Sequence, residues 1–119
     1  MLYLQPYRLD SNILVEHGYL TLNQIIINHK EKYIEFTTNI YLSKEDYING
    51  FAPVQGFPEI RGHLNYENFT DILDDIINWF VNTVELYSSA TEEEIMGNEE
   101  GVYDAQLLIL KNAVLDEEI

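Results

Sequence analysis

Apolar residues between positions 69 and 84 recur with the spacing of an α-helix, and no other feature constrains the fold as strongly. They follow the i, i+3, i+4, i+7 pattern over about four turns at Phe69, Ile72, Leu73, Ile76, Ile77, Phe80, Val81 and Val84. The pattern predicts an amphipathic helix over about 66–87. Asn65 suits its N-cap, and three acids suit its positive N-terminus, namely Glu67, Asp71 and Asp74. Such a helix must bury its apolar face against a second layer of structure.

The first 42 residues supply that layer. Apolar and β-branched residues dominate 13–15, 19–22, 24–27 and 33–42. The polar segment 28–32 has the length of a hairpin connection between two of these runs. Polar and apolar residues alternate over 33–40, which predicts one buried and one solvated face. Pro6 indicates that residues 1–9 form an edge strand or an arm. We therefore expect an α+β fold in which an N-terminal antiparallel sheet of three to five strands packs against the 66–87 helix.

Two shorter segments connect the sheet to the helix. Ser43 with Asp46 resembles a capping box and predicts one helical turn through Tyr47. Residues 50–62 hold three of the six glycines and two of the three prolines, so they predict a loop. The apolar residues of this loop favour a connector held against the core. A ligand-binding loop is the alternative.

The C-terminal segment 102–115 predicts a second helix after a polar, acidic linker over 88–100. Its apolar residues surround the helix axis instead of lining one face. Such a helix is either deeply buried or covered by another chain, and a homodimer through this segment is therefore expected. A last strand is the alternative interpretation.

Size and composition indicate one globular domain over 1–119. The chain has 119 residues, of which 46% are hydrophobic and 13% aromatic, enough for one core. Its apolar runs are far shorter than the roughly 20 residues of a membrane span, and residues 1–10 do not resemble a signal peptide. The absence of cysteine excludes disulfides. We expect a cytoplasmic protein with no membrane contact.

Charge is the strongest indicator of function, because 21 acids and 6 bases give a net charge of −15. Residues 1–64 hold seven acids and five bases, a net of −2. Residues 65–119 hold fourteen acids and one base, a net of −13. Nucleic-acid binding requires clustered bases, so we expect no direct binding of DNA or RNA. The expected partner is a cationic protein surface, that of a nucleic-acid-binding protein or nuclease.

Acidic and amide side chains of the predicted helix fall within an arc of about 100°, opposite the apolar face. Asp71 and Asp75 form a like-charge i, i+4 pair, which costs stability. A surface that accepts this cost favours an external cation, although a solvated helix face is the simpler alternative. Trp79 borders the arc, either as the rim of the core or as an interface anchor. The predicted partner-binding residues are Glu67, Asp71, Asp74, Asp75, Trp79, Glu85, Glu92, Glu93, Glu94, Glu99, Glu100 and Asp104.

Charge density decides whether this surface can imitate DNA. The stretch from Glu67 to Glu85 is about 27 Å long as a helix and carries five carboxylates, or one per about 5 Å, against one per about 1.7 Å in duplex DNA. The other nine acids of residues 65–119 would bring the density near that of the duplex. Mimicry therefore requires the linker and the C-terminal segment to share a face with the helix.

Catalytic patterns are weak, and we predict no catalytic residue, cofactor or metal site. The three histidines are scattered, and the acids at 71, 74 and 75 lack the second cluster and the bases of a magnesium–phosphate site. The leading hypothesis is a non-enzymatic inhibitor or decoy of the phage or mobile-element anti-defence type, by analogy of size and charge. An immunity protein or antitoxin against a basic nuclease toxin is the alternative of the same class. An assembly protein of a phage-like particle and a small carboxylate-dependent enzyme are the alternatives of other classes.

Overall fold

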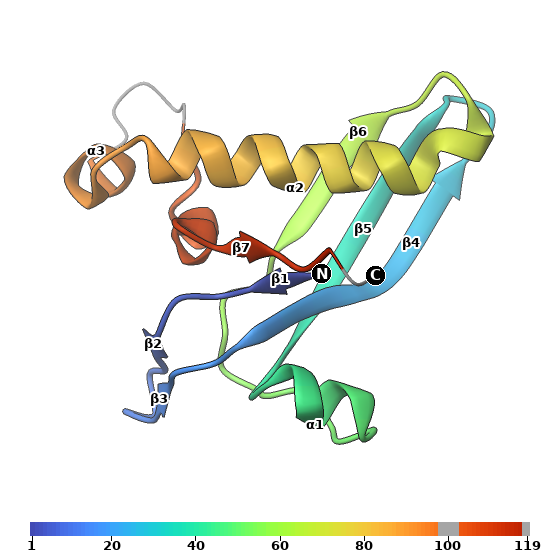
Figure 1. Ribbon diagram of the computed structural model, residues 1–119. Helices are drawn as coiled ribbons and strands as arrows, with labels where there is room; N and C mark the ends of the chain where they lie inside the picture. Colours follow the sequence, from blue (N-terminus) through green and yellow to red (C-terminus); the bar gives the residue numbers. More distant parts are fainter. Residues whose placement is uncertain (98–102, 118–119) are drawn as a thin grey trace.

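The computed structural model describes residues 1–97 and 103–117, and it confirms the α+β fold (Figure 1). Five antiparallel strands form the main sheet in the order β6-β5-β4-β1-β7. These strands are β1 (Leu2–Tyr3), β4 (Tyr19–Asn28), β5 (Tyr33–Tyr41), β6 (Arg61–Asn65) and β7 (Val114–Leu115). A separate two-stranded sheet pairs β2 (Tyr7–Arg8) with β3 (Leu14–Val15). The helical elements are α1 (Lys44–Ile48), η1 (Phe69–Asp71), α2 (Ile72–Ser88), α3 (Glu92–Met96) and η2 (Ala105–Leu110), of which η1 and η2 are 3₁₀-helices.

The hairpin of β4 and β5 is the longest pairing in the sheet and follows the prediction. Asn28 pairs with Tyr33 at the turn, where the Asn28 side chain accepts a hydrogen bond from the Glu31 N–H at 2.9 Å. The predicted strands 19–22 and 24–27 are one strand, which a β-bulge at Asn23 interrupts. Ile34, Phe36 and Ile40 are buried, so the alternation along β5 predicted the buried face correctly.

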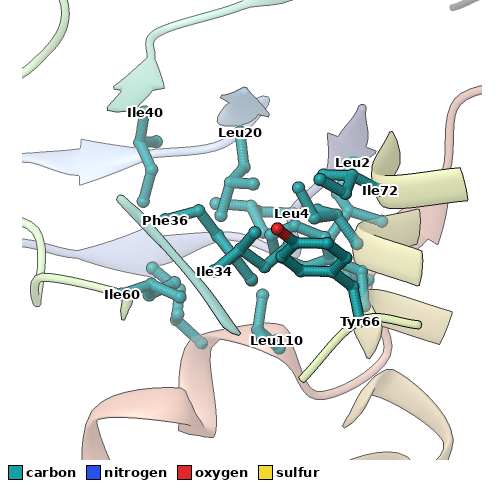
Figure 2. Close-up of a cluster of buried hydrophobic side chains, with 14 residues drawn as sticks. Leu2, Leu4, Leu20, Ile34, Phe36, Ile40, Ile60, Tyr66, Ile72 and Leu110 are labelled. Atoms are coloured by element: carbon teal, nitrogen blue, oxygen red, sulfur yellow. The ribbon is translucent and has the colours of Figure 1, made fainter. Parts of the chain in front are cut away.

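Helix α2 covers one face of the sheet (Figure 1). Ile76 and Phe80 are fully buried, and the rings of Phe80 and Phe36 lie 5.4 Å apart. Figure 2 shows buried side chains of the sheet converging with those of the loop, of α2 and of η2 in a single cluster. This cluster fixes the helix against the sheet.

The helix begins later than the sequence predicted. Tyr66 is buried, and its N–H donates to the Lys32 carbonyl at 3.1 Å, which extends the pairing of β5 with β6. The Asn68 side chain, not that of Asn65, accepts hydrogen bonds from the first turn, where the Thr70 N–H donates to it. A tertiary contact of the backbone therefore overrides the helical pattern at 66–68.

The C-terminal segment is a 3₁₀-helix and a strand, not one α-helix, and Val102 lies outside the described residues. Ile109 and Leu110 of η2 belong to the core, while β7 pairs with β1. The alternative of a last strand is therefore correct for Val114–Leu115. The predicted linker contains the short helix α3. The all-round apolar helix behind the dimer prediction is absent from 103–117, and dimerisation through this segment stays a prediction.

The connections differ from the sequence expectations at two strands. The Ser43 cap of α1 is confirmed, and the loop before β6 is held to the core by Ile60, which is fully buried. Residues 61–62, predicted as the end of the loop, begin strand β6. Strand β1 was predicted as an edge strand or an arm, yet it pairs with β4 and β7 on its two sides. Pro6 lies between β1 and β2, outside both.

No helix within residues 1–97 and 103–117 has the length and apolar character needed to cross a membrane.

Candidate functional site

A groove of about 590 Å³ runs between α2 and the end of β6, and we call it the α2–β6 groove. Three of the predicted acids line it, Glu67, Asp71 and Asp75, together with Trp79. Five further residues complete the lining: Leu64, Asn65, Asn68, Asn78 and Asn82. The groove is therefore walled by carboxylate and amide side chains around one indole ring. Such a lining can accept hydrogen bonds from ammonium or guanidinium groups.

Trp79 belongs to both the core and the groove. Its ring packs edge-on against Phe36 at 5.1 Å and against Phe80 at 5.1 Å. The side chain is only partly buried, and its remaining surface lines the α2–β6 groove. The two interpretations of Trp79 from the sequence, core rim and interface anchor, are thus compatible in one position. Because the ring is held by two aromatic neighbours, a partner would meet a pre-organised surface.

The other predicted acids lie elsewhere. Asp74 and Glu85 are exposed on α2 but do not line the groove. Glu92, Glu93 and Glu94 form the first turn of α3, where Glu94 completes a capping box with Thr91. The Asp104 carboxylate caps η2 by accepting from the Gln106 N–H at 2.9 Å. Glu99 and Glu100 lie outside the described residues.

The acids of α2 and α3 form no ion pair within residues 1–97 and 103–117. In that part of the chain the ion pairs are Lys44–Asp116 and Arg61–Glu59, each at 2.9 Å. Lys111, the one base after Arg61, points instead at the C-terminus of α2. Its ammonium donates to the carbonyls of Tyr87 and Ser88, each at 3.2 Å, and to that of Ala90. The helix therefore uses this cation as a cap, and its carboxylates stay available to an external cation.

Sequence reasoning missed two parts of this site. Strand β6 carries Gly62 and polar residues, so its composition gave no strand signal. The amides of Asn65 and Asn68 entered the groove only because Tyr66 pairs with β5 and delays the helix. A Cβ at Gly62 would lie 2.0 Å from Phe36 Cζ, so the ring occupies the space that a side chain would need. An isolated glycine before a polar run was the available signal.

A second polar cluster joins Met1, Tyr19, Lys44 and Asp116 and shares no residue with the lining of the groove. The Tyr19 hydroxyl donates to Asp116 Oδ2 at 2.6 Å and accepts from the Met1 amino group at 2.5 Å. Burial, followed by the hydrogen bond to Asp116, raises the pKa of Tyr19 above its ordinary value. Burial lowers the pKa of the Met1 amino group to about 6, against the attraction of Asp116. Lys44 compensates the buried carboxylate of Asp116, so the cluster ties the C-terminal segment to the sheet.

Within residues 1–97 and 103–117, no three histidine or carboxylate side chains are grouped closely enough to hold a metal ion. No protein-family model, curated protein or solved structure matches this chain. Any proposal about function therefore depends on the chemistry of the surface.

Proposed function

We propose that this protein is a non-enzymatic inhibitor or decoy whose acidic α2 surface occupies a cationic, nucleic-acid-binding site of another protein. The observation that carries the proposal concerns the carboxylates on α2, those of Asp74, Asp75 and Glu85. None of them has an ion-pair partner in the described part of the chain. Lys111 is already bound to the helix C-terminus.

The like-charge arrangement supports a binding role over mere solubility. Asp71 and Asp75 face the same groove four residues apart, and repulsion between such pairs destabilises a helix. An external cation would remove this repulsion on binding. Charges of this kind chiefly accelerate encounter and make association sensitive to salt.

The stronger version of the proposal, imitation of DNA, concerns charge density. Helix α3 follows the C-terminal end of α2 (Figure 1), so Glu92–Glu94 would lengthen the acidic surface beyond α2. The 17 residues of α2 span about 25 Å, and the acids of α3 extend this length. The length of the partner's binding site therefore distinguishes a DNA mimic from an inhibitor that contacts only part of this surface.

The experiment compares two triple variants in capture of partners from the native host cells. Asp71→Asn/Asp74→Asn/Asp75→Asn, here called the α2 variant, removes the charge of the α2 N-cap and two charges of the first turn of α2. The matched control removes three exposed charges from the N-terminal half, at Asp10, Glu16 and Glu31, by Asp→Asn and Glu→Gln changes.

At about 0.15 M salt, we expect the α2 variant to bind the captured cationic protein about tenfold more weakly or worse, because the charges that steer encounter are lost. The control should retain affinity within about threefold, since the Debye length of about 8 Å at this salt screens charges that lie outside the contact. Equal affinities of the two variants would contradict the proposal. The acidic α2 surface would then be only a solvated helix face. The identity of the partner then decides between an anti-defence inhibitor and an immunity protein or antitoxin.

A further inference from the structure

Strand β6 is an open edge of the sheet. It pairs with β5 on one side, and no strand formed by residues 1–97 or 103–117 lies on the other. Hydrogen-bonded pairs alternate along an antiparallel ladder, and the bond from the Tyr66 N–H to the Lys32 carbonyl fixes which pairs these are. The backbone groups of Gly62 and Leu64 therefore face β5. Those of Arg61, His63 and Asn65 face outward, and all three residues are exposed.

The open edge lies beside the α2–β6 groove. Leu64 and Asn65 form one wall of the groove, and Asp71, Asp75 and Trp79 line the α2 side. An extended segment placed along β6 would direct every second side chain to the α2 side of the sheet. Those side chains would enter the groove. The edge and the groove together thus offer both backbone partners and side-chain contacts.

We propose that β6 binds an extended, Lys/Arg-containing segment of another protein as an additional strand of the sheet. Backbone hydrogen bonds to Arg61, His63 and Asn65 supply affinity, and the groove selects basic side chains. Their ammonium or guanidinium groups meet Asp71 and Asp75, while their aliphatic stems cross the Trp79 ring. The inference rests on the proposed function and deepens it by naming how the partner is held.

Charge complementarity selects this occupant over a second copy of the chain. Two copies paired through β6 would bring two acidic grooves together in molecules that each carry a net charge of −15. Like charges placed opposite each other suppress association. A basic strand removes the repulsion that a second copy would double.

The test uses a fluorescent synthetic peptide of alternating lysine and threonine, titrated with the full chain in low salt. Two further peptides carry N-methyl groups on either the threonines or the lysines, which deletes backbone donors without changing charge. In a strand, alternate N–H groups point to opposite sides. We expect one methylated peptide to lose about tenfold in affinity or more and the other to bind like the parent peptide.

A variant of the protein tests the same backbone hydrogen bonds by removing a donor from β6 instead of from the peptide. His63→Pro removes an outward N–H without touching the ladder to β5, and His63→Ala is the matched control because both variants lose the ring that stacks on Tyr33. Thermal unfolding confirms that each variant is folded. We expect His63→Ala to bind like wild type and His63→Pro to lose about tenfold in affinity or more.

The other outcomes overturn the inference. If both methylated peptides or both His63 variants behave alike, or if the wild-type chain does not bind the parent peptide, strand addition is wrong. The proposed function survives if the α2 aspartate variant still loses its partner. If His63→Pro weakens binding but the change of the three aspartates does not, the partner is not recognised by its positive charge. That result would also overturn the proposed function. Self-association of wild type that His63→Pro abolishes would assign the edge to a second copy.

Discussion

Lys111 caps the helix that carries the candidate site, and its removal should weaken the fold. The last carbonyls of an α-helix lack partners within the helix, and the helix C-terminus carries a partial negative charge. The Lys111 ammonium lies 3.2 Å from the carbonyl oxygens of both Tyr87 and Ser88. Its side chain is half-buried, which limits the competition from water.

The variant Lys111→Met keeps most of the aliphatic stem and deletes these bonds. Hydrogen bonds to a charged group contribute about 1.5–3 kcal/mol, and the helix-terminus term of about 1–2 kcal/mol overlaps with them. We therefore expect a loss of about 2–3 kcal/mol. Unfolding entropy of about 2.1 cal/mol/K per residue gives about 250 cal/mol/K for 119 residues. The melting temperature should fall by about 8–12 °C.

The assay is thermal unfolding followed by far-ultraviolet circular dichroism. Lys30→Met, in the exposed β4–β5 turn, changes the net charge equally without removing a helix cap. We expect the control to lower the melting temperature by less than a quarter of the shift that Lys111→Met causes. Equal shifts in the two variants would refute the capping argument and attribute the loss to net charge alone.

Three further predictions concern stability and binding. Gly62→Ala should destabilise the fold by about 1–3 kcal/mol in urea denaturation, because its Cβ would meet the Phe36 ring at 2.0 Å; an unchanged midpoint would show that the ring moves freely. Wild-type stability should fall as pH rises above about 10, because Tyr19 ionises at its ordinary pKa only when unfolded; Tyr19→Phe should lessen this fall, and parallel pH profiles would contradict the assignment. Duplex and single-stranded nucleic acids should not shift in a gel with this protein at physiological salt, since a net charge of −15 repels phosphate; a shifted band would refute the charge argument.

The sequence by itself determined the elements whose signals are local. The apolar period of α2, the polar turn of the β4–β5 hairpin and the cap at Ser43 each depend on residues within a few positions of one another. Helical and strand periodicity therefore predicted them, and the α+β class followed from their order. The concentration of acids after residue 64 is likewise a property of the sequence alone.

The tertiary structure decided everything that depends on pairing between distant segments. Strand β6 pairs along the edge of β5, and its Gly62 leaves the space that the Phe36 ring occupies. Met1 and Asp116 are joined by a backbone hydrogen bond of 2.7 Å, which places β7 beside β1 across nearly the whole chain.

The candidate site shows the same division. The acids of α2 were evident from helical spacing, but their neighbours in the groove come from β6 and from the delayed start of the helix. Lys111 is the one base among residues 65–119, and the fold directs its ammonium to the carbonyls of Tyr87 and Ser88 at the end of α2. Local propensity is encoded within a few residues, whereas these contacts form only when the core brings remote segments together.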